Sequence, residues 1–118
     1  MSLEDRAKLF ASRAPQLRVE LSLYPEEIST RSNSILPGWS CPCFAAKESF
    51  ENRRAQIPAS DGAPILVDGP MQLGETREVD FIFPLAGKDA VPLIEKVTKF
   101  YLWEGRYIGE VDVLEVYD

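Results

Sequence analysis

The amino-acid sequence predicts an all-β fold, an antiparallel Greek-key-type β-barrel of about six strands with a short helix at its N-terminus. Three observations lead to this prediction. Short runs of alternating apolar and polar residues recur along the chain, turn-forming glycines and prolines separate these runs, and a helical pattern is clear only near the N-terminus. A chain of 118 residues is expected to form a single domain, with the helix in residues 1–14 and the barrel across residues 16–118.

The N-terminal segment combines a helix signal with a strand signal. Ser2 and Asp5 have the spacing of a capping box, and the apolar stripe that follows predicts a helix over residues 3–13. Residues 16–23 then alternate strictly, which predicts a strand with one buried face. The residues expected on that buried face are Leu17, Val19, Leu21 and Leu23.

The middle of the chain is less regular. Residues 39–46 are a second strand candidate, and Pro42 within it predicts an edge position or a bulge, because proline cannot donate a ladder hydrogen bond. Residues 47–59 are polar and predict a long excursion between strands. The next expected elements are strands within residues 63–67 and 76–84 and one or two turns of helix within residues 89–96.

The C-terminal stretch, residues 97–116, predicts a β-hairpin that closes the barrel around a tight turn at residues 104–106. Alternation divides its first strand into a core face with Phe100 and Leu102 and an outer face with Tyr101 and Trp103. The apolar residues change parity after Val113. This change predicts a bulge near Val113 or a strand end that is covered on both faces.

Composition and charge exclude several classes of function. The chain has no histidine, which removes Ser-His-Asp and Cys-His catalysis and most zinc sites. Residues 1–60 carry 8 Lys/Arg against 7 Asp/Glu, whereas residues 61–118 carry 5 against 12. An acidic half repels the phosphates of nucleic acids. No apolar run is long enough to span a bilayer, and the charged N-terminus predicts a cytoplasmic protein.

A series of short motifs runs in order between Val19 and Val116. They are Arg31 in Ser29-Thr30-Arg31, the segment Cys41-Pro42-Cys43-Phe44, the turn Met71-Gln72-Leu73-Gly74-Glu75, the hairpin Phe100-Tyr101-Leu102-Trp103-Glu104-Gly105-Arg106, and Ile108-Gly109. Their order and spacing resemble the C-terminal β-barrel, the third domain, of elongation factor Tu-like translation GTPases. In that family the counterparts are a Gly-Gly-Arg loop, a Tyr-Arg-Pro-Gln-Phe strand, a Met-x-Pro-Gly-Asp turn and a closing hairpin built on Phe-x-x-Arg-Glu-Gly and Val-Gly-x-Gly.

The resemblance implies a barrel and says less about function. The chain has no Gly-x-x-x-x-Gly-Lys-Ser/Thr loop, so GTP binding is not expected. In the full-length family this domain contacts the T stem of aminoacyl-tRNA, and the resemblance carries that role to Arg31 and Gly105. Cys43 stands where the family has glutamine, and Cys41 where it has arginine. These departures, together with the acidic half, disfavour tRNA binding.

Three other groups of residues are weaker site candidates. Cys41 and Cys43 are the only cysteines, and their strand spacing of roughly 6.5–7 Å between Cα atoms is at or beyond the limit for a disulfide. They are expected to be buried thiols, with a metal or redox role shared across a dimer as the alternative. Arg53 and Arg54 with Lys47 are expected in a solvated loop, with anion binding as the alternative. The carboxylates that alternate along strands are expected to be solvated rather than catalytic: Glu78, Asp80, Glu110 and Asp112.

The outer face of the hairpin is the strongest functional candidate. Tyr101 and Trp103 beside Arg106 have the composition of an interface hot spot. With Arg31 and Gly105 they form the candidate interaction surface. The alternative is that the N-terminal helix covers the two aromatic residues.

These observations predict a non-enzymatic protein-interaction module with no cofactor, metal or membrane site, which binds another protein or associates with itself. An immunity-type or regulatory partner is one form of this hypothesis. The alternative is an RNA- or translation-associated accessory factor that uses Arg31, Arg53 and Arg54. A small-ligand or enzymatic barrel is the least supported interpretation.

Overall fold

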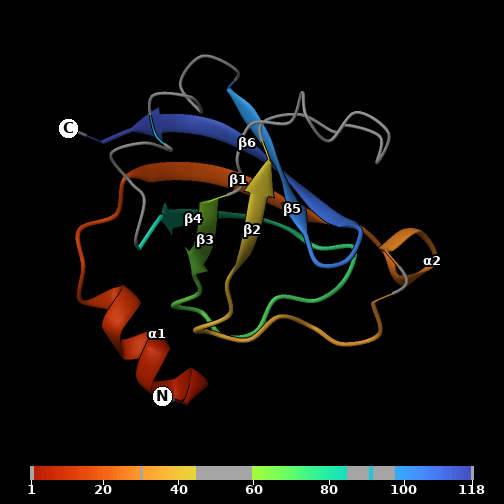
Figure 1. Cartoon of the computed structure of the whole chain (residues 1–118), viewed down its shortest axis with the longest axis horizontal. Helices are drawn as coiled ribbons and strands as arrows, with labels where there is room; N and C mark the ends of the chain where they lie inside the picture. Colours follow the sequence, from red (N-terminus) through yellow and green to blue (C-terminus); the bar gives the residue numbers. More distant parts are fainter. Residues whose placement is uncertain (1, 30, 45–59, 85–90, 92–97, 118) are drawn as a thin grey trace.

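Six antiparallel strands form a closed barrel. The computed structural model describes residues 2–29, 31–44, 60–84, 91 and 98–117, and within them the strand order is β1-β4-β3-β2-β5-β6 (Figure 1). The elements are α1 (Leu3–Ala11), β1 (Leu17–Leu23), α2 (Glu26–Ser29), β2 (Cys41–Phe44), β3 (Ser60–Ile65), β4 (Thr76–Ile82), β5 (Lys99–Trp103) and β6 (Tyr107–Val116). The predicted all-β barrel with a short N-terminal helix is confirmed.

The chain connections bring strands that are far apart in the sequence side by side in the barrel. Strand β1 lies beside β4 and β6 rather than beside β2, the strand that follows it in the chain. Such a returning connection next to three consecutive antiparallel strands is the Greek-key arrangement. In β1, Leu17 lies opposite Phe81 of β4 and opposite Val116 of β6. The N-terminal and C-terminal strands therefore close the barrel together.

Alternating side chains of the strands fill the barrel interior. In β1 the predicted inward residues are buried, and the residues between them are half-buried or exposed. Three phenylalanines, Phe81, Phe83 and Phe100, pack together with ring centroids 5.1 to 5.8 Å apart. Burial of this apolar surface is the main force that holds the strands together.

The closing hairpin forms as predicted. Its turn contains Gly105 with φ of +76°, a left-handed conformation that glycine adopts at little cost. The predicted bulge near Val113 is also present. Val19 of β1 lies opposite Val113, but Arg18 lies opposite Glu115, so Leu114 is the extra residue in β6. The bulge explains the change of parity in the sequence.

The prediction that Pro42 lies at an edge or in a bulge is wrong. Strand β2 lies between β3 and β5, and the closed barrel gives it no free edge. Pro42 lies opposite Asp61 of β3, whereas pairing with β5 begins only at Cys43. The missing N–H of the proline therefore removes no bond from the ladder with β5. Pro42 is therefore tolerated inside a closed barrel because β2 is not yet paired with β5 at that residue.

Helix α1 packs across one side of the barrel. Its Ser2 cap is confirmed, because Ser2 Oγ accepts a hydrogen bond of 3.1 Å from the Asp5 backbone N–H. Its one buried side chain, Phe10, packs with Ala63, Ile65 and Ile82 of β3 and β4. Strand β3 is separated from β5 by β2. The helix is therefore anchored on a different part of the barrel from the strand that carries Tyr101 and Trp103 (Figure 1).

Several predictions fall on other parts of the chain. The excursion over residues 47–59, including Arg53 and Arg54, lies outside the described residues, and so do residues 89–96 apart from Val91. Helix α2 was not predicted from the sequence. It is a single short turn that follows β1 directly.

Candidate interaction surface

Four aromatic side chains gather on the outside of the barrel at the closing hairpin. Phe44 ends β2, Tyr101 and Trp103 lie on β5, and Tyr107 begins β6; we call these four residues the hairpin aromatic cluster. The ring centroids of Trp103 and Tyr107 are 5.0 Å apart, and those of Phe44 and Trp103 are 6.0 Å apart, both in edge-to-face geometry. Each of the four side chains is half-buried, so each keeps part of its surface accessible.

Strand register explains why these four residues share a face. Phe44 lies directly opposite Tyr101, and Trp103 lies directly opposite Tyr107; residues paired in this way point to the same side of a sheet. The predicted outward orientation of Tyr101 and Trp103 is confirmed. Phe44 was missed by the sequence reasoning. The sequence did contain a signal for Phe44. The two cysteines occupy alternate positions of β2 and share one face, so Phe44, next to Cys43, must lie on the opposite face.

Arg31 is bound to the turn of the hairpin. Its guanidinium Nη1 makes an ion pair with Glu104 Oε1, and its Nε donates a hydrogen bond of 2.7 Å to the carbonyl oxygen of Asn33. Trp39 Nε1 donates to Glu104 Oε2 at 2.9 Å, and the Arg31 guanidinium lies 5.8 Å from the centroid of the Trp39 ring. The Arg31 side chain is only 17% exposed. Its charge is therefore largely neutralised by Glu104.

The other two predicted residues lie in the turn itself. Gly105 and Arg106 are exposed, and apart from the two chain neighbours of Gly105 no described residue has an atom within 4 Å of the position that a Cβ there would occupy. The glycine is thus required by backbone conformation rather than by crowding. All five predicted surface residues lie at one end of the barrel, on the hairpin or tied to it through Glu104. Glu104 and Trp39 were not predicted as members of this group.

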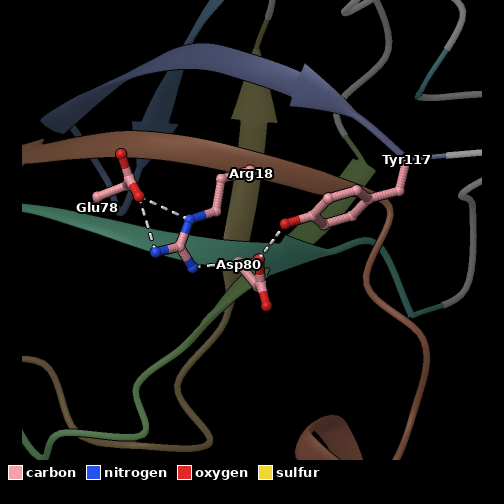
Figure 2. Close-up of polar contacts among 4 residues, drawn as sticks. All are labelled: Arg18, Glu78, Asp80 and Tyr117. Carbon is pink, nitrogen blue, oxygen red and sulfur yellow. Dashed lines mark hydrogen bonds and ion pairs between the residues drawn. The ribbon is translucent and has the colours of Figure 1, made fainter.

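A second polar network lies on the outer face of β1 and β4. Arg18 Nε and Nη2 donate to Glu78 Oε2 at 2.9 and 2.8 Å, and its Nη1 donates to Asp80 Oδ1 at 3.3 Å (Figure 2). The hydroxyl of Tyr117 donates to the same Asp80 oxygen at 2.7 Å. This hydrogen bond to Asp80 raises the pKa of Tyr117. The network holds Tyr117, the residue that follows β6, against the outside of the barrel.

The remaining strand carboxylates also face outward. Lys99 Nζ lies 3.5 Å from Glu110 Oε2 and 3.5 Å from Asp112 Oδ1. These carboxylates raise the pKa of Lys99, with Glu110 as the larger influence. A cleft of about 90 Å³ adjoins Arg18 and is lined by three carboxylates, those of Asp68, Glu78 and Asp80. Arg18 pairs with the last two of them, Glu78 and Asp80. An acid and a base with separated pKa values need an enclosed pair of carboxyls, and this arrangement does not provide one.

Both cysteines are part of the core. Cys41 and Cys43 are buried on the inner face of β2 as free thiols, and Cys43 Sγ donates to the carbonyl oxygen of Cys41 at 3.5 Å. Burial raises the pKa of Cys43 well above its usual value. The reactive thiolate is therefore disfavoured. Among the described residues no three His, Cys, Asp or Glu side chains are grouped to hold a metal ion.

Comparison with known proteins gives no match to a family model, a curated protein or a solved structure. The relation to the third domain of elongation factor Tu-like GTPases therefore stays a prediction that rests on the sequence motifs. In the part of the chain that the structure describes, neither helix has the length and apolarity needed to cross a bilayer.

Proposed function

We propose that this chain is a non-enzymatic protein-interaction module, and that the hairpin aromatic cluster and the turn at residues 104–106 form its contact surface. The observation that carries the proposal is the outward placement of four large aromatic side chains on one end of the barrel. Protein interfaces are enriched in Tyr, Trp, Phe and Arg, and aromatic anchors dominate their binding energy. The paired strands beneath the cluster hold these side chains in place before binding, which lowers the entropy lost on association.

The environment of Arg31 supports a protein partner over RNA. Arg31 is the position to which the resemblance assigns a tRNA contact, and phosphate binding requires an available cation. Here Glu104 occupies the guanidinium, and little of the Arg31 side chain reaches solvent. The acidic charge of residues 61–118 also disfavours RNA, because it repels phosphates. A cytoplasmic location belongs to the same proposal.

The direct test replaces Trp103 with alanine. We expect Trp103→Ala to weaken binding to a partner, or self-association, by at least about tenfold, because a hot-spot aromatic contributes roughly 2 kcal/mol or more. The free energy of unfolding should fall by no more than about 1–2 kcal/mol, since the side chain is only half-buried. The measurements are affinity capture from native cells with the full chain as bait, sedimentation for self-association, and thermal denaturation.

Val67→Ala is the matched control, because Val67 is an apolar side chain that is 79% exposed and lies beyond β3, away from the hairpin. It should leave both association and stability unchanged. A loss of folding in Trp103→Ala would instead identify Trp103 as a core residue. If filter binding of tRNA survived near-physiological salt, the RNA alternative would replace the present proposal.

A further inference from the structure

The hairpin aromatic cluster continues directly into an acidic face of the barrel. Strand register sets out two rows of outward side chains that cross the sheet. One row runs Phe44, Tyr101, Glu110, Ser22 and Thr76 through β2, β5, β6, β1 and β4. The next row runs Lys99, Asp112, Glu20 and Glu78 through β5, β6, β1 and β4. We call the carboxylates of these rows, Glu20, Glu78, Glu110 and Asp112, the acidic face.

The acidic face contains unfavourable pairs of like charge. Glu20 lies directly opposite Glu78 on one side and directly opposite Asp112 on the other. Like charges directly opposite each other destabilise a sheet. Arg18 neutralises Glu78, and Lys99 lies near Glu110 and Asp112. The exposed Glu20 makes no ion pair with any described residue.

The aromatic and acidic parts meet within a single row. Tyr101 lies opposite Glu110 on the neighbouring strand, and Phe44 lies opposite Tyr101. Aromatic ring faces attract cations through their quadrupole, and arginine also stacks on them. Carboxylates beside such rings pair with the same cations. The aromatic rings and the carboxylates of this surface therefore both favour a cationic group on the ligand.

We propose that the partner presents a positively charged, arginine-rich segment that lies across β5, β6 and β1. This inference rests on the proposed function, because it names the chemistry of the partner for the same surface. A second copy of this chain is a poor occupant, since a twofold contact would bring two acidic faces together. Phosphate backbones are repelled for the same reason. A basic protein segment is the occupant whose charge complements the face.

A fluorescent octa-arginine peptide is the probe for this surface, with octa-lysine and octa-glutamate as comparison peptides. The full chain should bind octa-arginine more tightly than octa-lysine and should not bind octa-glutamate. Two variants with the same change in net charge locate the site. The face variant carries Glu20→Gln and Asp112→Asn, and the control variant carries Glu4→Gln and Asp5→Asn on α1.

Fluorescence anisotropy at about 50 mM salt should give a dissociation constant about fivefold weaker for the face variant and less than twofold weaker for the control. Thermal denaturation of the face variant should show no loss of stability. The substitutions remove the repulsion around Glu20, and Lys99 loses its ion pair with Asp112 but keeps the one with Glu110. Equal weakening in both variants would mean that only net charge attracts the peptide. That result, or an absence of octa-arginine binding, overturns the inference.

The two proposals fail in different ways. If a partner captured by the full chain is lost in Trp103→Ala but retained by the face variant, the interaction surface stands and the basic segment is wrong. If the face variant loses that partner together with octa-arginine, the inference is supported. If Trp103→Ala loses no partner and binds octa-arginine like the unmodified chain, the hairpin surface itself is wrong, and the inference falls with it.

Discussion

At the scale of residues, Glu75 and its partner Arg77 together hold the turns around Gly69 and Gln72 next to the start of β4. Arg77 Nε donates to Glu75 Oε2 at 2.7 Å, and the same guanidinium donates to the carbonyl oxygens of Gly69 and Pro70 at 2.9 Å each. The backbone N–H of Gln72 donates to Glu75 Oε1 at 2.9 Å. The hydrogen bond from Arg77 lowers the pKa of Glu75 from its usual 4.5, and the smaller effect of the bond from the Gln72 N–H acts in the same direction.

A carboxyl whose pKa is lower in the folded state stabilises the protein above its unfolded pKa. That contribution is lost as the pH falls from about 4.5 through the lower folded value. We expect the free energy of unfolding, measured by urea denaturation from pH 7 to pH 3, to fall less with acid in Glu75→Gln than in the unmodified chain. Glu26→Gln, at an exposed residue of α2, is the control with the same change in charge. Identical acid curves for Glu75→Gln and the unmodified chain would contradict the role of Glu75.

Individual surface residues could be predicted only where strand parity decides their orientation. The outward position of Tyr101 and Trp103 follows from local alternation, and the structure confirms it. The environment of Arg31 does not follow from local sequence, because its partner Glu104 is 73 residues away. The resemblance assigns Arg31 a contact with tRNA, but the tertiary contact with Glu104 determines whether the charge of Arg31 is available.

At the scale of elements, α1 is an appendage held by a small contact. Phe10 is its only buried residue, and it packs on Ala63 and Ile82. Arg6 adds a hydrogen bond to Ser40 Oγ, and Arg13 Nη1 donates to the carbonyl oxygen of Pro84 at 2.8 Å. Isolated helices of nine residues are not stable in water, so α1 depends on this docking.

We expect Phe10→Ala to undock α1 while the barrel stays folded. The free energy of unfolding should fall by about 2 kcal/mol, less than the full cost of a core Phe→Ala change, because the helix can move away instead of leaving a cavity. Hydrogen exchange should show loss of protection in α1 and unchanged protection in β1. Leu9→Ala, at a side chain 38% exposed, should cost less than about 0.5 kcal/mol. Unfolding of the whole barrel in Phe10→Ala would show that α1 is integral to the core.

Strands whose residues alternate clearly between apolar and polar could be predicted from the sequence. The position of a strand within the closed barrel could not. The strand around residues 17–23 and the hairpin over residues 99–116 match the alternation in the sequence. The bulge at Leu114 was also visible, because it shifts the parity of apolar residues. The position of β2 between two strands depends on which distant segments meet, and a proline in the sequence carries no information about that.

At the scale of the whole molecule, the net charge of −6 is concentrated rather than spread. The acidic face sets Glu20 between two carboxylates, while Arg18 and Lys99 supply the cations of the same face. Repulsion at exposed positions is screened by salt, over a Debye length of about 30 Å at 0.01 M and about 8 Å at 0.15 M ionic strength. Salt also screens the attraction within ion pairs. The sign of the change in thermal stability with added salt therefore shows whether repulsion or ion pairing dominates on this face.

We expect repulsion to dominate, because the carboxylates outnumber the cations on this face. The midpoint of thermal unfolding should rise by about 2–4 °C between 10 and 200 mM KCl, which corresponds to somewhat under 1 kcal/mol for a domain of this size. Glu20→Gln should raise the midpoint at 10 mM KCl and reduce the salt response, since it removes the carboxylate that faces two others. A midpoint that falls with salt would mean that the Arg18 and Lys99 ion pairs outweigh the repulsion, and the acidic face would then lack the uncompensated charge that attracts a basic partner.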